Sequence, residues 1–177
     1  MIQTSSRGEL DLNPSVGSQD LRSAFSLFPS GVVAVAANVD GELVVIIASS
    51  FQVGISLSPP LVMCAIQGSS ARWPRLRGRD RLGVSVLAES QGPTAMQLAA
   101  RPGDGTPNVK TTITPLGAAF IHGAPLWLDC SIHNVVAAGD HNIVIFEVHS
   151  VGCAPEVEPL IWHRSGFRSL TPRRIEI

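Results

Sequence analysis

The feature that most constrains the fold is a pair of apolar segments joined by an Asp-Gly turn signal. Residues 32–37 read Val-Val-Ala-Val-Ala-Ala, residues 43–48 read Leu-Val-Val-Ile-Ile-Ala, and Asp40-Gly41 lies between them. β-Branched residues favour strands, and aspartate and glycine tolerate the positive φ angles of a type I′ turn. The sequence therefore predicts a tight antiparallel β-hairpin.

Turn residues also divide the rest of the chain into short apolar segments. The pattern predicts strands at 61–66, 81–87, 117–121, 125–137, 142–152 and 158–163, short helices at 20–28, 73–76 and 91–100, and a polar loop at 101–112. Many short strands with few short helices are typical of a mainly β fold and favour an antiparallel barrel with helical attachments. We expect a flexible N-terminal arm at 1–18, one domain at 19–171 and a C-terminal tail at 172–177.

The composition is apolar for a chain of this length. Hydrophobic residues make up 45% of the 177 residues and charged residues 15%, against about 25% charged in an ordinary domain. This excess predicts either a large core or a surface covered by a partner subunit. A net charge of −1 excludes a disordered chain and a basic nucleic-acid-binding body.

Several other classes are excluded by patterns that are missing. No apolar run reaches the length of a membrane-spanning helix, and the first residues do not form a secretory signal. The three cysteines show no CxxC spacing, which favours a reducing cytoplasm over a disulfide framework. Nucleotide-binding loops, a nucleophile elbow and zinc motifs are also missing, and the five histidines are scattered, so we expect no metal.

Two candidate ligand-binding segments contain paired serines. Ser49 and Ser50 follow an apolar strand, where they can either hydrogen-bond a polar ring edge or simply solvate the end of the strand. Ser69 and Ser70 precede a run in which Arg72 is the first of five arginines within ten positions. Arginine side chains match phosphate oxygens well, although a charge run is more often a solvated face.

Two further candidates lie at strand ends. Asp140 and His141 form a turn between two long strands, where a histidine can carry a proton near neutral pH or serve only as turn punctuation. Trp162 and Arg164 end the last predicted strand. They can stack on and pair with a nucleotide, or form the rim of the barrel.

Taken in chain order, seven segments resemble the flavin reductase family with the FMN-binding split-barrel fold. Within that family, the chain is most similar to the small reductase component of two-component flavin-dependent monooxygenases. The resemblance rests on Phe-Pro-Ser-Gly-Val at 28–32, Ala-Ser-Ser-Phe at 48–51, Ser-Leu-Ser-Pro-Pro-Leu-Val at 56–62, Ser-Ser-Ala-Arg-Trp-Pro-Arg-Leu-Arg at 69–77, Leu-Gly-Val-Ser-Val-Leu at 82–87, Gly-Ala-Pro-Leu-Trp-Leu-Asp-Cys at 123–130 and Gly-Asp-His-Asn-Ile at 139–143.

The resemblance implies an antiparallel split β-barrel that forms a homodimer, with flavin near the subunit interface. It implies hydride transfer from NADH or NADPH to FMN or FAD, after which reduced flavin diffuses to a partner monooxygenase. His141 is then the catalytic candidate on the nicotinamide side. The implied cofactor-binding residues are Pro29, Ser30, Gly31, Val32, Ala48, Ser49, Ser50, Ser69, Ser70, Arg72, Asp140, Trp162 and Arg164.

Two segments depart from the family pattern. Val45 and Ile47 stand where the family usually has glycine and threonine. Val45 would add bulk where the ligand approaches, and Ile47 would remove a hydroxyl that can reach the flavin. Residues 104–111 lack the arginine, phenylalanine and tryptophan of a flavin-covering loop. These departures favour two alternatives: a homologue that binds or converts another apolar small molecule, for example by cofactor-free cyclisation, or a non-catalytic partner subunit.

Overall fold

The computed structural model describes residues 17–100 and 109–170. Most of the expected arm, the C-terminal tail and positions 104–108 of the departing loop lie outside these residues. The helical elements are α1 (Ser18–Phe25), α2 (Trp73–Leu76), η1 (Glu89–Gln91) and α3 (Gly92–Ala99). The strands are β1 (Ser30–Gly31), β2 (Val33–Val39), β3 (Glu42–Ala48), β4 (Gln52–Leu57), β5 (Pro60–Gln67), β6 (Leu82–Val86), β7 (Thr111–Ile113), β8 (Ala119–Ile121), β9 (Leu126–Ala138), β10 (His141–Cys153), β11 (Ile161–His163) and β12 (Gly166–Arg168).

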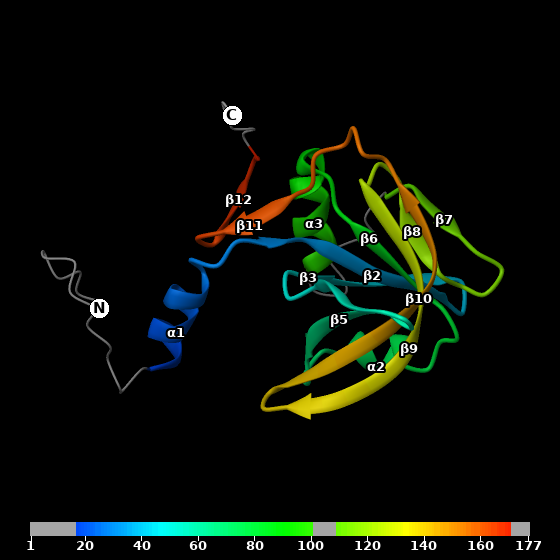
Figure 1. The fold of residues 1–177 in the computed structure, drawn as a ribbon, viewed down its shortest axis with the longest axis horizontal. Helices are drawn as coiled ribbons and strands as arrows, with labels where there is room; N and C mark the ends of the chain where they lie inside the picture. Colours follow the sequence, from blue (N-terminus) through cyan, green and yellow to red (C-terminus); the bar gives the residue numbers. More distant parts are fainter. Residues whose placement is uncertain (1–16, 101–108, 171–177) are drawn as a thin grey trace, which may run out of the picture.

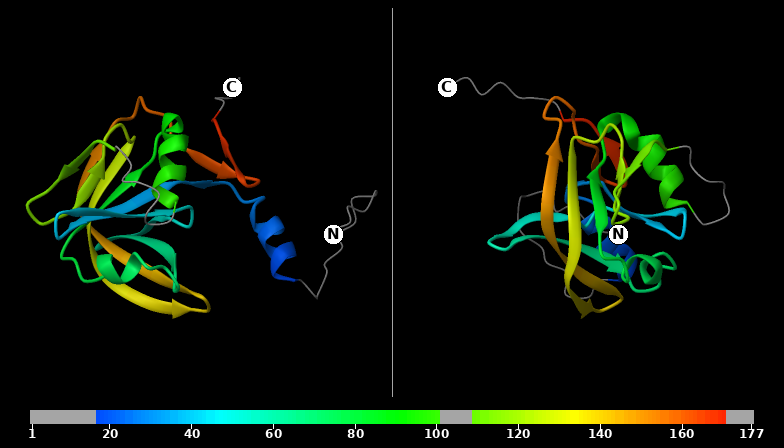
Figure 2. Two further views of the ribbon diagram at one scale, coloured as in Figure 1. Left: turned by 180° about the vertical axis from the view of Figure 1, so that it is seen from behind. Right: turned by 90° about the vertical axis from the view of Figure 1, so that its right-hand side faces the viewer.

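The expected mainly β, antiparallel fold is confirmed. Seven strands form one sheet in the order β3-β2-β6-β9-β10-β5-β4, and β3 also contacts β5, so the sheet closes on itself. Figure 1 shows this barrel with α3 against its outside, while α1 projects from it. The same helix stands apart from the sheet when the molecule is seen from behind in Figure 2. In the described part of the chain, no helix is long and apolar enough to cross a membrane.

The Asp-Gly hairpin forms as the sequence predicts. Strands β2 and β3 pair with Val39 opposite Glu42, and Asp40 and Gly41 have φ angles of 55° and 86°. The side-chain oxygen of Asn38 accepts a hydrogen bond of 2.9 Å from the Gly41 N–H. Both central residues have the positive φ of a type I′ turn, which keeps the two apolar strands in register.

Apolar side chains form two separate cores, one on each face of this hairpin. The first fills the barrel, where Val33, Val35 and Val84 are almost completely buried. The second lies outside, between the sheet and α3, and contains Ala34 and Ala36 with residues of α3 and β8. The alternation of valine and alanine along β2 therefore sends larger side chains into the barrel and leaves room for the helix outside.

Strand β8 crosses the outer face of β6 unusually closely. A Cβ added at Gly83 would lie 2.1 Å from the carbonyl oxygen of Ala119, so only glycine permits this crossing. The buried Ser85 hydroxyl accepts a hydrogen bond of 3.0 Å from the Ile121 N–H. Together these contacts hold the β7–β8 hairpin against the sheet.

The sequence prediction missed four paired strands. Strand β1, expected as part of a turn, pairs with β11. Strand β4 has an exposed or intermediate residue at each position, so it has no apolar face that periodicity could detect. Strand β7 begins at Thr111, within the polar loop expected at 101–112, and pairs with β8. Strand β12 has only three residues, and its pairing with β11 depends on a chain reversal at Arg164 and Ser165, which both have positive φ.

Candidate functional site

Two cavities share Ser49 and Trp162 and together form the candidate site. The larger has a volume of about 470 Å³ and the smaller about 180 Å³. They lie where the end of β3, the β1 segment and β11 meet. Six residues that the sequence analysis assigns to cofactor binding line them: Ser30, Val32, Ala48, Ser49, Ser50 and Trp162.

The two serines at the end of β3 have different roles in the fold. The Ser50 hydroxyl donates to the Ala65 carbonyl at 2.7 Å and accepts from the Ala65 N–H at 3.1 Å, so it ties the chain to β5. Ser49 is exposed and lines both cavities. The geometry therefore makes Ser49 the hydroxyl that is better placed to meet a ligand.

Trp162 forms an aromatic wall common to the two cavities. It pairs with Ser30 of β1 on one side and with Phe167 of β12 on the other. Its ring meets that of Phe167 edge to face, with centroids 5.2 Å apart and an angle of 69° between the planes, which is a favourable aromatic geometry. The Arg164 N–H donates to the Ser26 carbonyl at 2.7 Å, so the following turn is anchored to the end of α1.

The two departures on β3 have different structural consequences. Ile47 lines the smaller cavity with Ser49 and Trp162, as expected for a side chain near a ligand. Val45 is 5% exposed and belongs to the core between the sheet and α3. It lines neither cavity, so the expectation that its bulk faces a ligand is wrong: this position supports the helix.

The Ser69–Arg72 segment does not line these cavities. The Arg72 guanidinium donates to the carbonyls of Leu98, at 2.8 Å, and Ala100. It therefore satisfies carbonyl groups that would otherwise be orphaned at the end of α3. The Ser70 hydroxyl accepts a hydrogen bond of 3.3 Å from the Trp73 N–H at the start of α2. A role for Ser69, Ser70 and Arg72 in cofactor binding stays a prediction.

Asp140 and His141 lie at the tip of the β9–β10 hairpin. The His141 Nδ1 and an Asp140 carboxylate oxygen are 2.7 Å apart, and this hydrogen bond lowers the pKa of Asp140, followed by the charge of His141. The charge of Arg22 contributes in the same direction. The Gly68 N–H donates to the Asp140 carbonyl at 2.9 Å. Since Arg22 lines the larger cavity, the hairpin tip is electrostatically linked to the site.

The sequence analysis missed the contribution of α1. Phe25 and Phe28 belong to the helical segment expected at 20–28, for which no ligand role was predicted, but they are 69% and 75% exposed and line the larger cavity. Among the described residues that line this cavity, Arg22 is the one charged side chain. Arg22, Phe25 and Phe28 lie within one predicted helical segment, but the sequence does not show that this segment meets the serine turn.

Nothing in the described ranges indicates a metal centre. Within residues 17–100 and 109–170, no group of three or more histidine, cysteine, aspartate or glutamate side chains could hold a metal ion. The site instead combines hydroxyl groups, aromatic rings and one arginine. These groups suit a planar organic molecule that carries an anionic group.

Comparison with known proteins places the chain in a family. Residues 25–171 match the model of the flavin reductase like domain. A flavin reductase of Pseudomonas putida is 31% identical over 154 residues, covering 86% of this chain and 90% of the relative. The reductase component of 4-hydroxyphenylacetate 3-monooxygenase of Thermus thermophilus is 33% identical over 149 residues, covering 84% and 94%.

A solved structure agrees with these relatives. The NADH:FAD oxidoreductase SgcE6 of Streptomyces globisporus, determined in complex with NAD and FAD fragments, superimposes with a TM-score of 0.82. It is 32% identical in sequence, and the match covers 89% of this chain and 94% of that one. The chain therefore belongs to the flavin reductase-like domain family.

Proposed function

We propose that the chain is an NAD(P)H-dependent flavin reductase that supplies reduced FMN or FAD to a flavin-dependent monooxygenase. The observation that carries this proposal is the meeting of segments 30–32 and 48–50 with Trp162 around the two joined cavities. The family resemblance implies that these segments bind flavin, and the chain belongs to that family.

The described residues suggest how the site would serve the reaction. Reduced nicotinamide gives a hydride to flavin N5, so the protein must mainly hold two rings face to face at roughly 3–3.5 Å. Ser49 can hydrogen-bond a polar edge of the flavin, Trp162 bounds its apolar part, and Arg22 can pair with its phosphate. His141, oriented by Asp140 at 2.7 Å, is proposed to position the nicotinamide.

The direct test mixes the purified full-length protein with either flavin and either nicotinamide and follows absorbance at the nicotinamide band. We expect catalytic oxidation with at least one of the four pairs, at a rate well above the protein-free blank. Oxidation no faster than the blank with all four pairs would overturn the proposal. Flavin binding without turnover would then favour a non-catalytic subunit, whereas no flavin binding would favour a site for another apolar molecule.

We also propose that the chain forms a homodimer around this site. Exposed apolar side chains line the larger cavity, with Phe25 from α1 and Phe28 from the turn that follows it, and continue along the edge strand β4 with Val53 and Ile55. Such a concentration of apolar surface is typical of a subunit interface. A second copy on this face would bury these side chains and close the open side of the cavity.

Light scattering tests this assembly. Ile55→Glu places a charge on β4 and is expected to give a monomer with weaker flavin binding. The control Leu116→Glu alters an apolar side chain that is more exposed than Ile55 (58% against 38%) but lies on the β7–β8 hairpin, and it should remain dimeric. A monomeric unaltered protein would refute the homodimer.

The three cysteines are free, which supports our proposal that the protein is located in a reducing cytoplasm.

A further inference from the structure

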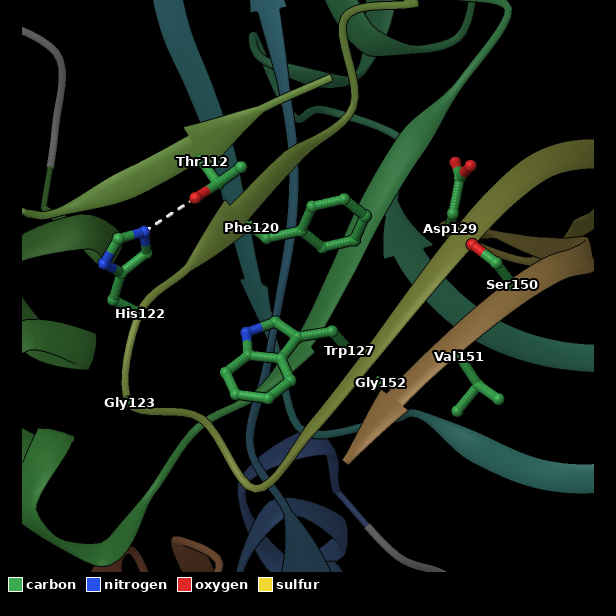
Figure 3. A pocket seen from close by; sticks show the side chains of 9 residues that line it. All are labelled: Thr112, Phe120, His122, Gly123, Trp127, Asp129, Ser150, Val151 and Gly152. Atoms are coloured by element: carbon green, nitrogen blue, oxygen red, sulfur yellow. Dashed lines mark hydrogen bonds between the residues drawn. The ribbon is translucent and has the colours of Figure 1, made fainter. Parts of the chain in front are cut away.

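A third cavity lies on the outer face of β9 and β10, beside the β7–β8 hairpin. Its volume is about 530 Å³, which falls within the usual range for small-molecule sites. It shares no lining residue with the two cavities of the candidate active site. Figure 3 shows the side chains that line it.

Two aromatic rings make up one part of this cavity. Phe120 comes from β8 and Trp127 from β9, and Figure 3 shows the rings beside each other. The Trp127 indole N–H donates to the Ile121 carbonyl at 2.6 Å, which fixes the orientation of its ring. Gly152 on the neighbouring strand leaves the indole uncovered, since a Cβ there would lie 3.5 Å from a ring carbon. The cavity therefore offers preoriented aromatic surface.

The rim of the cavity is also held in place. The Thr112 hydroxyl and the His122 ring nitrogen Nε2 are 2.7 Å apart, as the dashed line in Figure 3 indicates. The backbone N–H of His122 donates to the Lys110 carbonyl at 3.0 Å. Both bonds join the two sides of the β7–β8 hairpin, so they hold together the part of the chain that forms one side of the cavity.

Asp129 brings unused hydrogen-bonding capacity to this cavity. It lines the space with Ser150, and its side chain is 21% exposed. The exposed part is not the oxygen Oδ1, which is buried and, like the nearby Arg81 Nη1, has no hydrogen-bond partner in the described structure. The other oxygen is 3.9 Å from an Arg81 nitrogen, which is close enough to balance charge but too far for a hydrogen bond. The accessible part of the carboxylate can therefore accept a hydrogen bond from a molecule in the cavity, and the Ser150 hydroxyl offers a second polar group there.

We propose that this cavity is a second small-molecule site, which binds a neutral planar aromatic compound with one hydrogen-bond donor, such as a phenol or an indole. The ring stacks against Phe120 and Trp127, and its donor reaches Asp129. Arg81 already balances the carboxylate, so a cationic ligand has no advantage. An aromatic carboxylate has no hydrogen-bond donor for Asp129, and its charge would lose water in the cavity without a free cation to replace it.

Calorimetric titration of the full-length protein with three naphthalene derivatives tests the chemistry of the ligand. We expect 2-naphthol to bind with a Kd below about 1 mM, naphthalene at least about tenfold more weakly because it lacks the donor, and 2-naphthoate not to bind. Failure of 2-naphthol to bind, or equal binding of naphthalene, would overturn the proposal. Competition by FMN would also overturn it, because it would place the compound in the flavin site.

A matched pair of variants tests the location. Gly152→Val narrows the space beside the indole, at a position where a Cβ makes only ordinary contact, and should weaken 2-naphthol binding at least about tenfold. Gly78→Val makes the same change at an exposed position with open space and should leave binding unchanged. Equal affinity in both variants would refute this location. Flavin reduction should be unaffected by either change, so the outcome is independent of the proposed reductase activity.

Discussion

The Ser50 hydroxyl lies between the two backbone groups of Ala65, accepting from its N–H at 3.1 Å and donating to its carbonyl at 2.7 Å. This one side chain replaces two backbone hydrogen bonds that the chain cannot make where it leaves β3 for β4. The hydroxyl is therefore occupied by the fold, while the neighbouring Ser49 lines both cavities. Adjacent, identical residues thus have separable roles.

Alanine substitutions should separate those roles. Ser50→Ala removes two hydrogen bonds to the backbone and is expected to lower the free energy of unfolding by about 1–2 kcal/mol. Ser49→Ala should leave stability unchanged within about 0.5 kcal/mol and weaken flavin binding several-fold. Urea unfolding and fluorescence titration with FMN measure the two effects. If Ser49→Ala were the destabilising change, the hydrogen-bond assignment would be wrong.

Restoring a hydroxyl on β3 should improve flavin binding. Ile47 lines the smaller cavity, so Ile47→Thr places a hydrogen-bonding group beside the ligand. We expect a Kd for flavin lower by about 3–10-fold, the effect of one added hydrogen bond. The control Val45→Gly restores the other family residue, but Val45 is buried beneath α3. It should cost about 3 kcal/mol of stability without tightening binding, and weaker binding by Ile47→Thr would contradict this placement.

Two arginines can be distinguished by the phosphate of FMN. Arg22 lines the larger cavity, whereas the guanidinium of Arg72 is bonded to carbonyls at the end of α3. Arg22→Gln should weaken FMN binding about tenfold and leave riboflavin binding unchanged, because riboflavin has no phosphate. Arg72→Gln should mainly lower the unfolding free energy. An equal loss for FMN and riboflavin in Arg22→Gln would show that this arginine does not bind the phosphate.

Periodicity and turn chemistry predicted the parts of this fold whose residues bury one clear face. The Asp40-Gly41 hairpin and the single turn of α2 agree with the structure because local sequence determines them. Strand β4 was not predicted, because neither of its faces is buried within the chain. Likewise, the contacts of Arg72 with residues 26 and 28 positions later depend on tertiary packing, which no local pattern encodes. The serine turn and Trp162 were candidates because of their residue types at strand ends, and the family resemblance then implied a cofactor-binding role for them. Arg22 belongs to no such motif.

The hairpin tip should affect the nicotinamide and not the flavin. Since a carboxylate only accepts hydrogen bonds, the Nδ1–H of His141 donates to Asp140 and leaves Nε2 for a substrate. His141→Asn should reduce kcat/KM for NADH by about 100-fold, the cost of a misplaced reactant. The Kd for flavin should change less than twofold. Asp140→Asn, which retains an acceptor, should have a smaller effect of the same kind. Stopped-flow reduction and flavin titration measure these quantities, and a loss confined to flavin affinity would contradict the assignment.

Alkaline pH should destabilise the protein through a buried thiol on β9. Burial, aided by the charge of Asp129 and opposed by that of Arg81, raises the pKa of Cys130 from its usual 9.0 to about 12. The unfolded state then releases the thiol proton first, so stability is complete below about pH 9 and is lost as the pH rises towards 12. The slope is about 1.4 kcal/mol per pH unit for one thiol. Burial also raises the pKa of Cys64, which acts in the same direction. The chain has no tyrosine, so no phenol group titrates in this pH range. Urea unfolding from about pH 8 to about pH 11 should therefore give a shallower decline for Cys130→Ala than for the unaltered chain. Parallel declines would show that Cys130 is not held protonated by the fold.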